Sequence, residues 1–210
     1  SGCPDNGPGW FHVYDYALGF IAGWGAHPLD LLVWAYDIHR AGIWEVEGKG
    51  VVPPEGCNDA IVDWDARIRF GNGVEMTYQA SGVAEDDDPR LKPLGNYAQL
   101  IGTDGWVAIS YGGLCCEPAS LRWSTLGPND VHLPRSRAHE ANFLECVQTR
   151  ARPVSPIDDA VRSDLVSHVC DIAIRTGRKL RWDPLQEEFL GDAEANRMRG
   201  RASRQPWDLL

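Results

Sequence analysis

The chain has 210 residues and a formal net charge of −10, and 43% of its residues are hydrophobic while 24% are charged. This length and composition fit one domain with a sizeable core, and the acidic balance argues against nucleic acid as a partner, because such affinity comes largely from Lys and Arg side chains. No apolar run approaches the ~20 residues of a membrane span and no signal-peptide pattern opens the chain, so no membrane partner is expected.

The N-terminal part opens with a polar stretch over residues 1–9 that is rich in Gly and Pro and is typical of a linker. Residues 10–18 mix aromatic and polar side chains and predict an ordered loop. A helix is predicted from Pro28, which suits a first helical turn because its missing N–H costs nothing there. The helix should end near 41–42, and its apolar stripe comprises Leu29, Leu32, Val33 and Tyr36.

The middle of the chain alternates apolar and polar residues, which is typical of half-buried strands. The predicted strands cover 43–48, 61–70, 74–80, 97–102, 106–111 and 120–123. Gly71-Asn72-Gly73 and Thr103-Asp104-Gly105 supply the turns of two predicted hairpins.

The last third is predicted to be helical. Residues 139–150 carry Phe143, Leu144 and Val147 on one side. A longer helix is predicted with Ser155 as N-cap, Pro156 in its first turn and Gly177 as C-cap. This order of a helix, a run of strands and further helices predicts an α+β fold. We expect an open, mostly antiparallel (mixed) sheet with helices on one face and the other face available for oligomerisation.

His27 directly precedes the predicted helix. The positive end of the helix dipole favours a neutral imidazole there, which can accept a proton. Gly23 and Gly25 allow a ligand to approach, and Asp30 could orient the ring. The alternative is that His27 only caps the helix, its side chain accepting a backbone N–H.

An aromatic and acidic cluster lies just upstream and could face the same space. Such side chains suit a polyhydroxylated ligand, because rings stack and carboxylates accept hydroxyl protons. The candidate substrate-binding residues are His12, Tyr14, Asp15, Tyr16, Trp24 and Asp30. The alternative is that the aromatic residues fill the core. No metal site is expected, because no helical His/His or His/Glu spacing occurs, and the remaining histidines are expected at the surface or in caps.

The six cysteines lie at positions 3, 57, 115, 116, 146 and 170 and form neither a C-x-x-C pair nor a zinc spacing with His. We expect a reduced set and buried thiols at Cys146 and Cys170, which favours a cytoplasmic protein, although the even count leaves disulfides open. The acidic run over 85–88 is interpreted as a solvated loop, with a weak metal site as the alternative.

Several motifs carry a family resemblance. GWGAHPLDLLVWA, YAQLIGTDGWVAIS, HEANFLECVQTRARPVSP and GRKLRWDPLQEEFLGDAEANRMRGRASRQPW occur in this order. With them the chain resembles the C-terminal portion of the Gfo/Idh/MocA oxidoreductases, in particular a branch related to glucose–fructose oxidoreductase. The resemblance implies a two-domain parent with an N-terminal Rossmann domain that binds NAD or NADP. It also implies a C-terminal α/β domain that supplies the substrate pocket and the oligomer interface.

The resemblance also implies how this chain is divided and what His27 does. It implies that residues 1–9 are a linker remnant from a missing Rossmann domain and that 10–210 form the substrate-binding and oligomerisation domain, which alone binds no cofactor and is inactive. It also implies that His27 takes the substrate hydroxyl proton. Many members have an aspartate four residues earlier, where this chain has Gly23, so Asp15 or Tyr14 is a candidate to replace it.

The expected function is therefore that of a domain of an NAD(P)-dependent oxidoreductase. The expected partners are a carbohydrate-like small molecule (a sugar, polyol or glycoside) and further copies of the chain in a dimer or tetramer. One alternative is a stand-alone binding or assembly module, motivated by aromatic positions on the outer face of the 61–80 hairpin. Others are a partner in NAD-assisted glycoside hydrolysis or elimination, and a cofactor-independent glycosidase or lyase using Asp15 and Asp30. An exported protein is the alternative to a cytoplasmic one.

Overall fold

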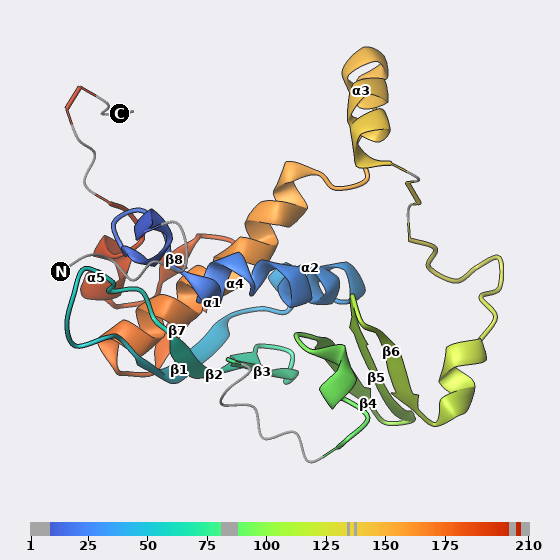
Figure 1. The fold of residues 1–210 in the computed structure, drawn as a ribbon, viewed down its shortest axis with the longest axis horizontal. Coiled ribbons are helices and arrows are strands. Elements are labelled where there is room, and N and C mark those ends of the chain that lie inside the picture. The colour runs from blue at the N-terminus through green and yellow to red at the C-terminus, as the bar shows by residue number, and fades with distance from the viewer. Residues whose placement is uncertain (1–8, 81–87, 134, 137, 202–204, 207–210) are drawn as a thin grey trace.

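The structure is a computed structural model that describes residues 9–80, 88–133, 135–136, 138–201 and 205–206. Short helices come first, two antiparallel sheets follow, and the longest helix runs diagonally across the molecule beside the larger sheet (Figure 1). The predicted open α+β fold with antiparallel strands is confirmed. The linker predicted over 1–9 lies, except for Gly9, outside the described residues.

The N-terminal segment forms η1 (Gly9–His12), α1 (Phe20–Gly23), α2 (Ala26–Ala35) and η2 (Ile38–Arg40). The α2 helix begins two residues before Pro28, because Gly25 already has helical backbone angles of φ −59° and ψ −32°. It ends earlier than predicted, because Tyr36 is extended at φ −147° and ψ 117°.

The larger sheet has the strand order β3-β2-β1-β7-β8, and every pairing in it is antiparallel. Its strands are β1 (Trp44–Val51), β2 (Asp63–Phe70), β3 (Glu75–Gln79), β7 (Leu180–Asp183) and β8 (Glu188–Phe189). The first three confirm the predicted strands and their hairpin. The strands β7 and β8 were not predicted, because they are too short to show an alternating pattern.

The smaller sheet has the order β4-β5-β6, again antiparallel, with β4 (Ala98–Gly102), β5 (Gly105–Ser110) and β6 (Gly113–Glu117). The hairpin over its first two strands was predicted. The strand predicted over 120–123 is wrong: this segment is a 3-10 helix, η4 (Ala119–Trp123), and a further one, η3 (Lys92–Leu94), precedes β4. The third strand comes earlier because Gly113, at φ 135°, turns the chain straight back from β5.

The C-terminal helices are α3 (His139–Thr149), α4 (Ile157–Thr176) and α5 (Ala193–Arg197). Ser155 does not cap α4, because Pro156 occupies the N-cap position with an extended backbone. Gly177 ends the helix as predicted, in the left-handed region at φ 64°.

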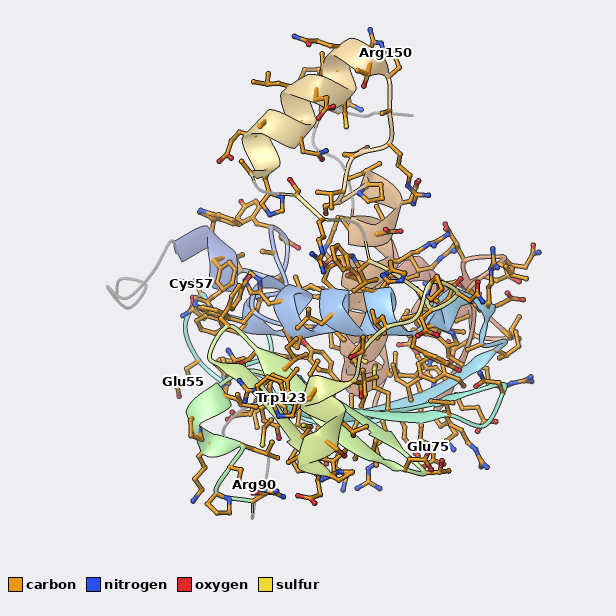
Figure 2. All side chains as sticks on the ribbon, turned by 90° about the vertical axis from the view of Figure 1, so that its right-hand side faces the viewer. Glu55, Cys57, Glu75, Arg90, Trp123 and Arg150 are labelled. Carbon is orange, nitrogen blue, oxygen red and sulfur yellow. The ribbon has the colours of Figure 1, made fainter. Side chains whose placement is uncertain are left out.

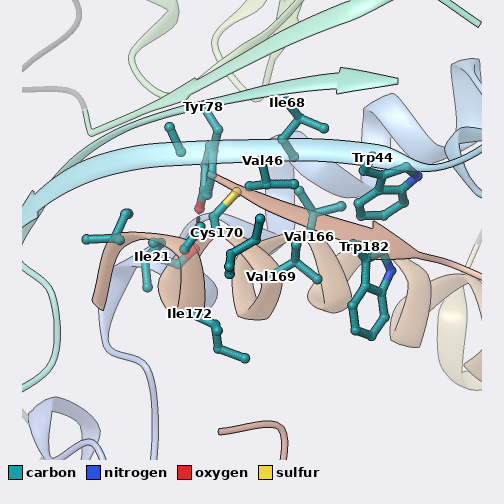
Figure 3. Close-up of a cluster of buried hydrophobic side chains, with 14 of the residues drawn as sticks. Ile21, Trp44, Val46, Ile68, Tyr78, Val166, Val169, Cys170, Ile172 and Trp182 are labelled. Carbon is teal, nitrogen blue, oxygen red and sulfur yellow. Dashed lines mark hydrogen bonds between the residues drawn. The ribbon is translucent and has the colours of Figure 1, made fainter. Parts of the chain in front are cut away.

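The core lies between α4 and the inner face of the larger sheet (Figure 3). Ile68 of β2, Trp44 and Val46 of β1, and Val166 and Val169 of α4 are fully buried there. Tyr78 of β3 reaches across this layer, and its hydroxyl donates to the Ile21 carbonyl of α1. The start of α2 is therefore attached to the core of the larger sheet through α1.

The outer face of the larger sheet carries charged residues instead. Glu45 lies opposite Arg69, Glu47 opposite Arg67, and Lys49 opposite Asp65. The aromatic residues of the 61–80 hairpin, Trp64, Phe70 and Tyr78, are all buried on the other face. The expectation of aromatic residues on the outer face was therefore wrong, because the strand alternation turns them toward α4.

Among the described cysteines, one departs from the expected reduced set. Cys57 is disulfide-bonded, whereas Cys115, Cys116, Cys146 and Cys170 are free. Cys170 is buried as expected, and burial raises the pKa of its thiol. Cys146 is only partly buried.

The acidic run lies largely outside the described residues, apart from Asp88, which pairs with Arg90 at 2.6 Å. In the described part of the chain, no three His, Cys, Asp or Glu side chains are placed to hold a metal ion. No helix there is long and apolar enough to cross a membrane.

Candidate active-site cleft

A cleft of about 400 Å³ opens between the first turns of α2, the end of β5 and the start of α4. Apolar side chains such as Leu31 and Ile109 form part of its wall. Its polar lining includes His27, Asp30, Asn96, Ser110, Tyr111 and Ser163. No lysine or arginine is among the described residues that line it.

His27 is the second residue of α2, and its side chain is exposed toward this cleft. Its Nδ1 lies 3.2 Å from the Tyr111 hydroxyl oxygen. Its ring packs beside Trp24, with ring centroids 5.4 Å apart, and edge-on to Tyr111 at 5.5 Å. The side chain therefore makes its hydrogen bond across the cleft and not to the helix backbone, which contradicts the cap interpretation.

Asp30 lies one turn further along α2 and lines the same cleft. The Ser163 hydroxyl donates to its Oδ1 at 2.9 Å and is also 2.9 Å from the Asp159 carbonyl. Asp30 thus joins α2 to α4 across the cleft. The contact with the imidazole that was expected from Asp30 is made by Tyr111 instead.

Gly23 is closed to a larger side chain. A Cβ atom added there would lie 2.5 Å from Cζ of Phe11. The Phe11 ring therefore fills the space where the family resemblance predicts an aspartate. His12 packs beside the same ring at 5.0 Å and beside Phe20 at 5.2 Å, and it does not line the cleft.

Tyr14 lies in a second cluster, outside the cleft lining. Its ring is sandwiched between the guanidinium groups of Arg175 at 3.5 Å and Arg201 at 3.9 Å. Arg175 Nε in turn contacts both carboxylate oxygens of the buried Asp171, at 3.0 and 3.1 Å. Burial, and then the charge of Asp171, raises the pKa of Tyr14.

Asp15 and Tyr16 are exposed on the same N-terminal segment and do not line the cleft. Of the predicted residues, the structure brings together His27, Trp24 and Asp30. A substrate-binding role for His12, Tyr14, Asp15 and Tyr16 stays a prediction.

The second wall of the cleft was not predicted from the sequence. Tyr111 was counted as the end of a strand, and Asn96, Ser110 and Ser163 were not singled out. The glycines at 112 and 113 were the one available signal, since polar residues beside a tight turn at a strand end often carry function. Which helix that turn faces depends on how the two sheets dock, and this is not a local property of the sequence.

Comparison with known proteins agrees with this architecture. The model of an oxidoreductase family, the C-terminal alpha/beta domain of Gfo/Idh/MocA, matches residues 10–209. This chain belongs to the Gfo/Idh/MocA oxidoreductase family. A search of curated proteins finds no match.

Solved structures share the fold at low sequence identity. An NAD-binding protein from Listeria innocua aligns with a TM-score of 0.52 and 16% identity over 85% of this chain and 51% of its own. The WlbA dehydrogenase from Bordetella pertussis, in complex with NADH and UDP-GlcNAcA, aligns with a TM-score of 0.55 and 14% identity over 83% of this chain and 48% of its own. The chain therefore spans about half the length of these structures, and at such identities the likeness shows the fold alone.

Proposed function

We propose that this chain is the substrate-binding and oligomerisation domain of an NAD(P)-dependent oxidoreductase that acts on a neutral sugar, polyol or glycoside. The observation that carries the proposal is the cleft, in which an exposed imidazole stands among hydroxyl, amide and carboxylate groups. The family of this chain and the NADH-bound dehydrogenase of the same fold support the nicotinamide-dependent part of the proposal.

The chemistry of the cleft favours a ligand rich in hydroxyl groups. The amide of Asn96 and the carboxylate of Asp30 offer hydrogen-bond donors and acceptors in this lining. The hydroxyls of Ser110 and Ser163 already donate within the chain, to the Leu94 carbonyl and to Asp30, so each offers only its oxygen as an acceptor. Trp24 is 50% exposed beside His27 and offers an apolar face for a sugar ring. Phosphate and carboxylate groups are usually bound by Arg or Lys, which the described lining lacks, so we assign the cleft to a neutral substrate.

The cleft residues do not fit a dinucleotide. A pyrophosphate is usually held by a glycine-rich turn between a strand and a helix. The turn after β5 joins two strands, and the described cleft lining holds no cation. In this proposal the dinucleotide is bound by the half of the parent enzyme that corresponds to the unmatched length of the relatives.

His27 is the proposed proton acceptor. A neutral imidazole can take the proton of a substrate hydroxyl when a ring nitrogen lies within about 3 Å of that oxygen. Trp24 and Tyr111 hold the ring from two sides. Asp30, fixed by Ser163, accepts a hydrogen bond from a further hydroxyl of the substrate.

Replacement of His27 in the intact parent enzyme tests this role. His27→Ala should lower kcat by about 10²–10⁴, the contribution typical of a general base. His139→Ala is the matched control, because His139 is an exposed histidine at the start of α3, away from the cleft lining. An unchanged kcat for His27→Ala would refute the assignment.

We propose the outer face of the larger sheet as the surface for a dimer or tetramer. Its rows of opposed Glu and Arg residues, such as Glu47 and Arg67, can pair with those of a second copy. Such contacts weaken when salt screens the charges. Sedimentation velocity of the parent enzyme at low and high salt tests the proposal, and a monomer at low salt would contradict it.

The disulfide at Cys57 supports the exported alternative over a cytoplasmic protein. Disulfides persist mainly in oxidising compartments. Thiol trapping of the parent enzyme in its own cells tests this, and a fully alkylated Cys57 would favour the cytoplasm.

A further inference from the structure

A side chain from the smaller sheet reaches the proposed proton acceptor. Tyr111 directly follows β5, and its hydroxyl oxygen lies 3.2 Å from Nδ1 of His27, 84 positions away in the sequence. The two rings meet edge-on at an interplanar angle of 72°. Both residues line the cleft.

The other partners expected for His27 are engaged elsewhere. Position 23 has no carboxylate, and the Phe11 ring fills its space. Asp30 accepts its hydrogen bond from Ser163. Tyr14 is sandwiched between two arginines. Within the described residues, Tyr111 is therefore the hydrogen-bond partner that the structure gives to the imidazole.

This bond leaves one ring nitrogen of His27 open to a ligand. An imidazole has two nitrogens, and the bond made by one sets the tautomer and the direction of the other. With Nδ1 bonded to Tyr111, only Nε2 remains for a ligand. The Tyr111 side chain is 87% exposed, so its hydroxyl can accept a hydrogen bond from His27 while its own O–H donates to water.

We propose that Tyr111 is the positioning residue of His27. The Nδ1–H group donates to the Tyr111 oxygen, so that Nε2 is unprotonated and faces the cleft. When a substrate hydroxyl gives its proton to Nε2, the resulting imidazolium keeps its Nδ1–H bond to Tyr111. This inference rests on the proposed role of His27, and it gives the Tyr111 hydroxyl the role that the family resemblance assigns to an aspartate.

The tautomer of His27 tests the inference without any assay of activity. In this chain labelled with ¹⁵N histidine, long-range ¹H–¹⁵N spectra distinguish the two ring nitrogens of each of the six histidines, and His27→Gln assigns the signal. We expect the Nδ1–H tautomer of His27 in the wild type and a shift toward Nε2–H in Tyr111→Phe. A wild-type Nε2–H tautomer, or an unchanged spectrum in the variant, would overturn the inference.

Tyr36→Phe is the matched control for the spectra. It also removes one tyrosine hydroxyl, but this hydroxyl bonds Asn72 at the hairpin turn and does not line the cleft. We expect no change in the His27 signals of this variant.

Kinetics of the intact parent enzyme give an independent readout. Loss of one hydrogen bond of ordinary strength should lower kcat in Tyr111→Phe by up to about tenfold. KM should change less, because the affected interaction acts on the base and not on substrate binding. The acidic limb of the kcat profile, along which His27 would become protonated, should also move, which a purely structural role would not cause.

The two proposals fail in different ways. If His27→Ala leaves kcat unchanged, the proposed function fails, whatever the spectra show. If His27→Ala is impaired but Tyr111→Phe keeps the wild-type kcat and pH profile, the role of Tyr111 fails and that of His27 stands.

Discussion

The helices α3 and α4 follow each other in the chain and have opposite surroundings. In α4, nine residues are buried against the larger sheet and the N-terminal helices. In α3, no described residue is buried, and Phe143, Leu144 and Val147 are 63%, 59% and 47% exposed. Figure 1 shows α3 projecting from the body, and Figure 2 shows Arg150 at its far end.

An apolar stripe in the sequence thus predicts a helix, but it does not predict which surface the helix packs against. Both segments have helical periodicity, and both form helices. Only α4 meets a surface within this chain. Similar substitutions in the two helices should therefore change the free energy of unfolding by very different amounts.

The largest effect is expected in α4. Ile172 is 4% exposed, and Ile172→Ala should lower the free energy of unfolding by about 2–5 kcal/mol, through lost burial and a residual cavity. Urea denaturation followed by tryptophan fluorescence measures this. A loss below about 1 kcal/mol would show that α4 is less tightly packed than the structure indicates.

A smaller, pH-dependent effect is expected at the buried carboxyl of α4. Burial raises the pKa of Asp171 despite the facing Arg175. A carboxyl whose pKa is higher in the folded state favours folding when it is protonated. Its contribution to the free energy of unfolding is therefore fully present below the unfolded-state pKa of about 3.9, and it is lost as the pH rises through the folded-state pKa. Asp171→Asn should therefore flatten the decline in stability above about pH 4.

The stability of Asp171→Asn should be compared with that of Asp171→Ala. The alanine variant leaves the buried end of Arg175 without its acceptor, and should cost about 1–3 kcal/mol more than Asn. Equal stability curves for the wild type and Asp171→Asn would show that the carboxyl does not titrate differently in the fold.

The smallest effect is expected in α3. Leu144→Ala should change the stability of this chain by no more than about 0.5 kcal/mol, because the side chain has little burial to lose. The same denaturation experiment measures it beside Ile172→Ala. A loss comparable to that of Ile172→Ala would mean that α3 packs against the body in solution.

Local patterns predicted much of the fold. Glycine turns and alternating residues located both hairpins, and helical spacing located α2, α3 and α4. The pattern could not locate β7 and β8, because each is a strand only through its neighbour: β7 pairs with β1, and β8 pairs with β7. In the same way, 120–123 alternates like a strand but forms η4 and pairs with none of the described strands.

The candidate site was predictable on one side only. His27 and Asp30 belong to one helix, and their spacing shows that they share a face. Tyr111 lies beside His27 only because the smaller sheet packs next to α2. Tyr14 lies outside the cleft, where its ring packs between Arg175 and Arg201. These are long-range contacts that no window of the sequence contains.

The two walls of the cleft are supported by different hydrophobic cores. His27 stands on a helix attached through α1 to Tyr78 and the main core, whereas Ser110 and Tyr111 stand on a sheet with a small core of its own, built from Leu91, Leu94 and Ala108. Mutations in the second wall can therefore accumulate without endangering the main core. Such a division would let substrate contacts in the second wall change during evolution while the proposed proton acceptor and its partner Tyr111 are kept.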